Sequence, residues 1–134
     1  DQEIVFSLEK KVQKQVELHS ANTIKIAEDL TFTKFIFLGS GSYAGIAKEA
    51  TLKLKEMTQT ICESYSALEF RHGPISIVDE KTCVILLSQN ASRSYEKSLV
   101  QHIQQFGGKV VAIGEDAEVL NADSSVSLPS CISD

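Results

Sequence analysis

Apolar residues recur at helical spacing along the first part of the chain. Ile4, Leu8, Val12 and Val16 follow one another at intervals of four, and residues at that interval share one face of an α-helix. The same segment is rich in Glu, Lys and Gln, which are strong helix formers. The pattern predicts that residues 1–30 form one or two amphipathic helices that pack on the rest of the protein.

From residue 31 onward, dense apolar runs alternate with segments of helical spacing. The predicted strands are residues 34–39, 59–64, 82–88, 109–114 and 124–129, and the predicted helices are 43–58 and 93–108. Continuous apolar strands that alternate with helices are typical of a parallel sheet with helices on both faces. We therefore expect residues 31–134 to form one α/β domain of three αβα layers. Its sheet would be doubly wound, five-stranded, mostly parallel and flavodoxin-like.

Composition and charge narrow the classes of function. A net charge of -5 without a basic cluster argues against nucleic acid and anionic membranes as partners. No apolar run is long enough to span a membrane. The three cysteines, Cys62, Cys83 and Cys131, lack the spacing of metal ligands, so we expect free thiols in a reducing cytoplasm and no metal site. The chain starts without methionine and stops just after a strand, so we expect a fragment of a longer polypeptide.

A small-residue loop, "LGSGSYAG", joins the first strand of the domain to the next helix. Its candidate ligand-binding residues are Gly39, Ser40, Gly41 and Ser42. Small residues let a ligand approach the backbone, and free amides with hydroxyl groups suit an anion. A dinucleotide site is an alternative, because Gly45 extends the glycine pattern and Glu63 closes the following strand.

The helix predicted over 43–58 carries charges beside its apolar stripe. At about 100° per residue, the expected core stripe is Ile46, Ala50, Leu54 and Met57, and the expected solvent side is Lys48, Thr51 and Lys55. Lys53 falls inside the apolar arc, with Glu49 and Glu56 at its margin. A lysine there is costly unless it is paired, so we expect a semi-buried ion cluster or the polar wall of a substrate cleft. This lysine disfavours the dinucleotide alternative.

Two further loops follow strands and lie at the same edge of the predicted sheet. "EFRHGP" places His72 between Arg71 and a Gly-Pro turn, which is either an ordinary surface turn or a functional histidine. "SQNAS" offers Ser88 and Ser92 as possible anion ligands at the start of helix 93–108, with a solvated turn as the alternative. In open α/β sheets, ligands bind at the carboxyl ends of the strands.

Together, "LGSGS", "AKEATLKLKE" and "ESYSALEFRHGP" resemble the SIS (sugar isomerase) family over residues 20–130. The resemblance is closest to the second SIS domain of two-domain phosphosugar enzymes: the tagatose-6-phosphate ketose/aldose isomerase (galactosamine-6-phosphate deaminase) family and the isomerase half of glucosamine-6-phosphate synthase. It implies that Glu56 moves a proton between C1 and C2 and that His72 assists ring opening, often across a subunit interface. It implies that Glu49 and Lys53 line the substrate site.

The resemblance further implies a cytoplasmic enzyme that acts on a sugar phosphate without a cofactor and that forms a homodimer or pairs with another SIS domain. In the two-domain relatives, the hydroxyl-rich phosphate loop belongs mainly to the first domain, and in the synthase a C-terminal tail supplies a catalytic lysine. This sequence shows neither feature, so we expect the isolated chain to have little activity. A non-catalytic phosphosugar sensor and a dinucleotide-binding domain remain the alternatives.

Overall fold

The computed structural model describes residues 1–28 and 31–129, in two compact units that divide between Leu30 and Thr31. The first unit is a single helix, α1 (Gln2–Ala27). The Asp1 side chain caps it by accepting a hydrogen bond of 2.9 Å from the Glu3 amide, which satisfies one of the free N–H groups of the first turn. The predicted N-terminal helix is confirmed, and its packing on the domain stays a prediction.

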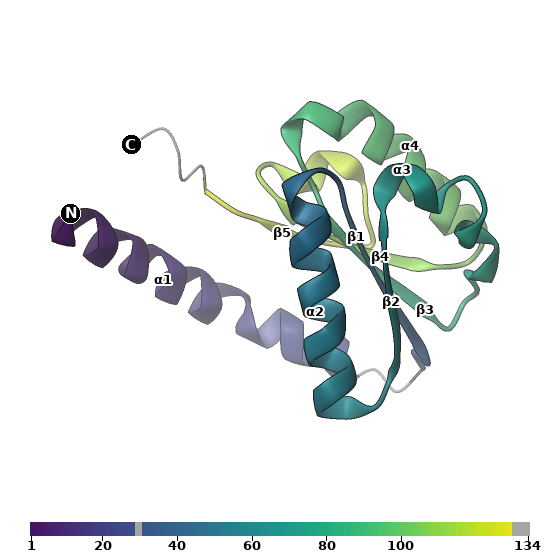
Figure 1. Ribbon diagram of the computed structural model, residues 1–134, viewed down its shortest axis with the longest axis horizontal. Helices are drawn as coiled ribbons and strands as arrows, with labels where there is room; N and C mark the ends of the chain where they lie inside the picture. Colours follow the sequence, from purple (N-terminus) through teal and green to yellow (C-terminus); the bar gives the residue numbers. More distant parts are fainter. Residues whose placement is uncertain (29–30, 130–134) are drawn as a thin grey trace. The chain divides into compact units, whose positions relative to one another are not determined.

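The second unit is an α/β domain that starts with the first strand (Figure 1). Its strands are β1 (Lys34–Gly39), β2 (Ile61–Ser66), β3 (Thr82–Leu87), β4 (Lys109–Gly114) and β5 (Ser124–Ser127). Its α-helices are α2 (Ser42–Thr58), α3 (Ala67–Phe70) and α4 (Arg93–Gln105), with short 3-10 turns at Pro74–Ile77, Asn90–Ser92 and Ala117–Leu120. All strand pairs are parallel, in the order β2-β1-β3-β4-β5, which confirms the predicted fold class.

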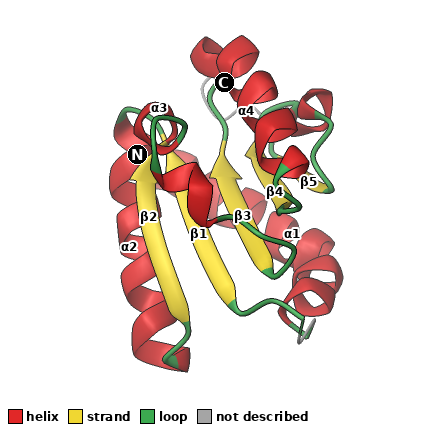
Figure 2. Ribbon diagram, turned by 90° about the vertical axis from the view of Figure 1, so that its right-hand side faces the viewer, coloured by secondary structure: helices red, strands yellow, loops and turns green. Residues whose placement is uncertain are grey.

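The strand order explains where the helices lie. The chain moves outward from β1 to β2 through α2, and outward in the other direction from β3 to β4 through α4. Because both crossovers are right-handed, the two helices cover opposite faces of the sheet (Figure 2). Among the described residues, no helix combines the length and apolar character that a membrane span requires.

The main core fills the space between the sheet and the α3–α4 side. Fully buried side chains there include Ile36 and Leu38 of β1, Leu86 of β3, and Leu99 and Ile103 of α4. The alternate strand residues point to the α2 side, since successive side chains on a strand face opposite ways. On that side Phe35, Phe37, Ile85 and Leu87 are only half-buried, so the two faces of the sheet are covered unequally.

The predicted core stripe of α2 is wrong at two of its four positions: Ile46 and Met57 are 54% and 80% exposed, whereas Ala50 and Leu54 are half-buried. The fully buried residues of this helix are Ala47 and Thr51. Small side chains let the helix approach the sheet closely, and the Thr51 hydroxyl tolerates burial because it donates to the Ala47 carbonyl at 2.9 Å. With that face inward, Lys53 points to solvent instead of lying in the apolar arc.

Candidate functional site

The charged cluster of α2 is present, but it is exposed. The Lys53 amino group lies 3.5 Å from the Glu49 carboxylate and 3.7 Å from the Glu56 carboxylate, and each of the three side chains is about 60% exposed. The predicted pairing is therefore confirmed and the predicted partial burial is wrong. Exposed ion pairs add little to stability, so these three charges contribute little to holding the domain together.

The glycine loop lies at the carboxyl edge of the sheet, where β1 meets the start of α2. A Cβ atom on Gly39 would lie 2.4 Å from the Tyr43 carbonyl oxygen, and Gly41 has a left-handed φ of +57°, so both positions favour glycine. The Gln89 side chain donates a 2.6 Å hydrogen bond to the Ser40 carbonyl. That bond ties the glycine loop to the loop that follows β3.

The loop after β3 is organised around a buried carboxylate. Glu96 is fully buried and accepts hydrogen bonds from the Ser88 hydroxyl at 2.6 Å and from the Gln89 amide at 3.1 Å. Ser88 is itself buried, so its hydroxyl is engaged and faces a carboxylate. This arrangement does not favour an anion at Ser88, and anion binding by Ser88 and Ser92 stays a prediction.

The two predicted catalytic residues lie at opposite ends of β2. Glu56 precedes the first residue of this six-residue strand, and His72 follows its last residue by a short helix. Five steps of about 3.3 Å give a separation of roughly 17 Å along the strand. Both side chains are exposed. A single copy of the domain therefore does not bring the Glu56 carboxylate and the His72 imidazole together.

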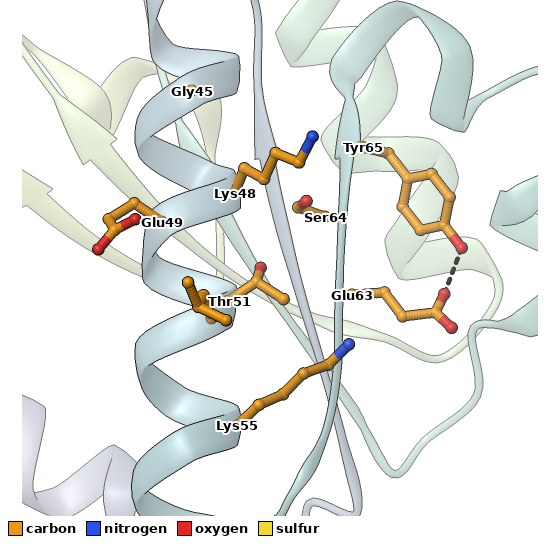
Figure 3. Close-up of a pocket in the computed structure, with 9 residues that line it drawn as sticks. Gly45, Lys48, Glu49, Thr51, Lys55, Glu63, Ser64 and Tyr65 are labelled. Carbon is orange, nitrogen blue, oxygen red and sulfur yellow. Dashed lines mark hydrogen bonds between the residues drawn. The ribbon is translucent and has the colours of Figure 1, made fainter.

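A cavity of about 600 Å3 lies between α2 and β2 (Figure 3). Its lining residues are Gly45, Lys48, Glu49, Thr51, Leu52, Lys55, Glu63, Ser64 and Tyr65. Of the predicted site residues, only Glu49 contributes to it. Lys48 and Lys55 are exposed, as expected from the sequence, and they line the open side of this cavity. Thr51, which was also expected to face solvent, is buried against the sheet.

Two titratable groups near the cavity have shifted pKa values. The Tyr65 hydroxyl donates a hydrogen bond to Glu63, which raises the pKa of Tyr65 to about 12. Burial raises the pKa of the Cys62 thiol, and a hydrogen bond with Thr51 and the charge of Lys55 oppose that shift. Cys62 and Cys83 are buried and form no disulfide, as predicted, and Cys131 lies outside the described residues. Residues 1–28 and 31–129 contain no cluster of metal-ligating side chains.

Comparison with known proteins decides the family. A model of the SIS domain matches residues 33–126. The chain belongs to the SIS domain family. The curated relatives of this SIS domain include glutamine–fructose-6-phosphate aminotransferases (isomerizing). The one from Bacteroides thetaiotaomicron is 41% identical over 118 residues, which cover 81% of this chain and 19% of that protein. The one from Agrobacterium fabrum is 33% identical over 111 residues, 78% of this chain and 18% of that protein.

Solved structures agree with this assignment. The C-terminal domain of glucosamine-fructose-6-phosphate aminotransferase from Francisella tularensis aligns with a TM-score of 0.79 at 28% identity, covering 94% of this chain and 36% of that one. Glucosamine-6-phosphate deaminase from Thermotoga maritima aligns with a TM-score of 0.65 at 33% identity, covering 78% of this chain and 32% of that one. Tagatose-6-phosphate ketose/aldose isomerase from Escherichia coli aligns with a TM-score of 0.66 at 25% identity, covering 90% of this chain and 36% of that one. The chain thus spans about a fifth of the curated relatives and about a third of these structures.

Proposed function

We propose that this SIS domain supplies proton-transfer residues for aldose–ketose isomerisation of a sugar phosphate, or for deamination of an amino-sugar phosphate. The observation that carries the proposal is the exposed cluster of Glu49, Lys53 and Glu56 on α2. These charges do little for stability, and Lys53 orients Glu56 from 3.7 Å. The names of the related aminotransferase, deaminase and isomerase support the same reaction class.

In this mechanism the Glu56 carboxylate takes the proton from one of the two carbons that interconvert and returns it to the other. Lys53 and Glu49 contact the substrate hydroxyl groups beside the base. The loop residues Gly39, Ser40, Gly41 and Ser42 lie at the other end of α2, about 21 Å from Glu56 along the helix. In this proposal they therefore contact, through backbone amides and hydroxyl groups, a substrate that is bound to the Glu56 of a second copy. His72 moves a proton at the ring oxygen when the sugar opens.

The position of His72 adds a requirement to the proposal. Because Glu56 and His72 lie beyond opposite ends of β2, a strand roughly 17 Å long, a complete site needs His72 from a second copy or a second SIS domain. The active protein is then at least a dimer, with each site built from two surfaces.

The proposal is tested by grafting residues 33–126 of this chain in place of the matching segment of the Bacteroides thetaiotaomicron aminotransferase, to which the chain is 41% identical. The host then supplies the remainder of the site, and sugar interconversion is followed by NMR. We expect the graft to be active and Glu56→Gln to lower kcat at least about a hundredfold, because a general base is lost. The exposed carboxylate variant Glu80→Gln is the matched control.

Mixing two inactive variants tests the shared site. Grafts with Glu56→Gln or His72→Asn are each expected to be inactive. Remixed as random dimers, they are expected to recover about a quarter of the activity, since half of the dimers are mixed and one of their two sites is intact. A fully active Glu56→Gln graft would contradict the role of Glu56. An inactive mixture would contradict the sharing of His72.

A further inference from the structure

The cavity between α2 and β2 is separate from the residues proposed for proton transfer. Glu56 and His72 do not line it, and Glu49 contributes from its rim. It lies at the edge of the sheet, because β2 pairs only with β1 among the described strands. Its volume of about 600 Å3 falls in the range of small-molecule sites.

The lysines of α2 differ in their ion pairing, and the unpaired ones line this cavity. Lys53, on the opposite side of the helix, is paired with two carboxylates. Lys48 and Lys55 line the cavity, and among the described residues neither has a carboxylate within salt-bridge distance. Figure 3 shows both side chains extending from α2 toward β2. Two unpaired ammonium groups at one cavity favour a ligand with two anionic groups.

The groups between the two lysines favour a ligand with hydroxyl groups. Ser64 lies on β2 facing α2, between the levels of the two lysines (Figure 3), and its hydroxyl donates and accepts hydrogen bonds. The Glu63 carboxylate extends to the other side of β2, where it accepts from the Tyr65 hydroxyl, so it does not repel an anion in the cavity. The positive charges lie at the two ends of the cavity, and the negative groups of a ligand belong there.

We propose that this cavity is a second ligand site, specific for a polyhydroxylated molecule with an anionic group at each end. Lys48 and Lys55 are seven positions apart, which is about 10 Å along a helix, and each holds one anionic group. A sugar phosphorylated at both ends, or a phosphorylated sugar acid, has this length and this charge pattern. A sugar with a single phosphate leaves one lysine without a partner.

The test is an NMR titration of the whole chain at low ionic strength with fructose 1,6-bisphosphate and with 6-phosphogluconate. We expect amide shifts at residues 45–55 and 63–65, and at least about tenfold weaker binding of fructose 6-phosphate. Lys48→Gln and Lys55→Gln are each expected to weaken the binding of fructose 1,6-bisphosphate about tenfold. Lys97→Gln, an exposed lysine on α4, controls for general loss of positive charge.

Three results would overturn the proposal. One is the absence of any shift in the folded chain. Another is an equal loss of affinity in Lys97→Gln, which means unspecific attraction. The third is fructose 6-phosphate binding as tightly as fructose 1,6-bisphosphate with shifts centred on Glu56, which means a single site shared with the proposed substrate. The inference does not use Glu56 or His72 in its chemistry, so loss of proton transfer in Glu56→Gln leaves it standing.

Discussion

At the scale of single residues, Glu96 shows that a charged side chain expected at the surface of a helix can be buried and can organise a loop. In the sequence it is one carboxylate of a polar helix. In the structure it is fully buried and accepts hydrogen bonds from the Ser88 hydroxyl and the Gln89 amide. A buried carboxylate without such donors would be costly. Ser88, which the sequence suggested as an anion ligand, therefore donates its hydroxyl to a carboxylate eight positions away. No pattern in the local sequence predicts this hydrogen bond.

Tyr65 carries the clearest pH dependence. Its hydroxyl donates to Glu63, and a phenolate could not, so the folded state favours the neutral phenol and the pKa of Tyr65 rises to about 12. The contribution of this pair to stability is full below the ordinary tyrosine pKa of about 10. It is lost as the pH rises through the folded-state pKa.

Tyr65→Phe is expected to remove one phenolate transition, the one near pH 12, from an absorbance titration of the folded protein. Tyr43→Phe is the control and is expected to keep it. The idea fails if the transition survives in Tyr65→Phe.

At the scale of elements, the close approach of α2 to the end of β1 requires glycine at one position of the glycine loop and not at another. Gly39 closes β1 directly under the first turn of α2, where an added Cβ atom would lie 2.4 Å from the Tyr43 carbonyl oxygen. Gly45 lies within α2, and nothing is within 4 Å of its added Cβ atom. The two glycines look alike in the motif, yet only the first is demanded by packing.

Gly39→Ala is expected to lower the free energy of unfolding by about 2–3 kcal/mol, because backbone has to move. Gly45→Ala is expected to raise it by about 0.5–1 kcal/mol through helix propensity. Urea unfolding followed by circular dichroism measures both, with Lys97→Ala as a surface control. Equal effects in the two variants would contradict the packing argument.

At the scale of the whole molecule, the two faces of the sheet are covered unequally. Phe35, Phe37, Ile85 and Leu87 remain half-buried on the side of α2, while the α3–α4 side is closed by a dense core. An apolar surface of this kind gains free energy when it is covered. The apolar row of α1, which includes Val12 and Val16, has the matching chemistry, and its packing on the domain is the prediction to test.

Val16→Glu is expected to lower the free energy of unfolding of the domain by about 2 kcal/mol if this row is buried in the whole chain. Lys14→Glu places a carboxylate on the other side of the helix, with a larger change of net charge than Val16→Glu, and is expected to have little effect. Chemical denaturation followed by tyrosine fluorescence reports on the domain itself, since all three tyrosines, Tyr43, Tyr65 and Tyr95, lie in it. If both variants and the unchanged chain have the same free energy of unfolding, the apolar row of α1 does not pack on the domain.

The sequence by itself determined the strands, the helices, the parallel sheet and the family motifs, because apolar spacing and glycine loops are local properties. It also placed Glu49, Lys53 and Glu56 close together, since they lie on neighbouring turns of one helix. Only the tertiary structure decided which face of α2 is buried, because that depends on how closely Ala47 and Thr51 let the helix approach the sheet.

The tertiary structure also decided the distance between Glu56 and His72. They belong to two successive family motifs and stand sixteen positions apart in the chain. Between them, strand β2 carries the chain from the amino-terminal end of the parallel strands to their carboxyl end. Glu56 and His72 are therefore close in the sequence and far apart in the structure. The physical reason is that β2 is extended and pairs along its whole length with β1, so its two ends cannot meet within one copy of the domain.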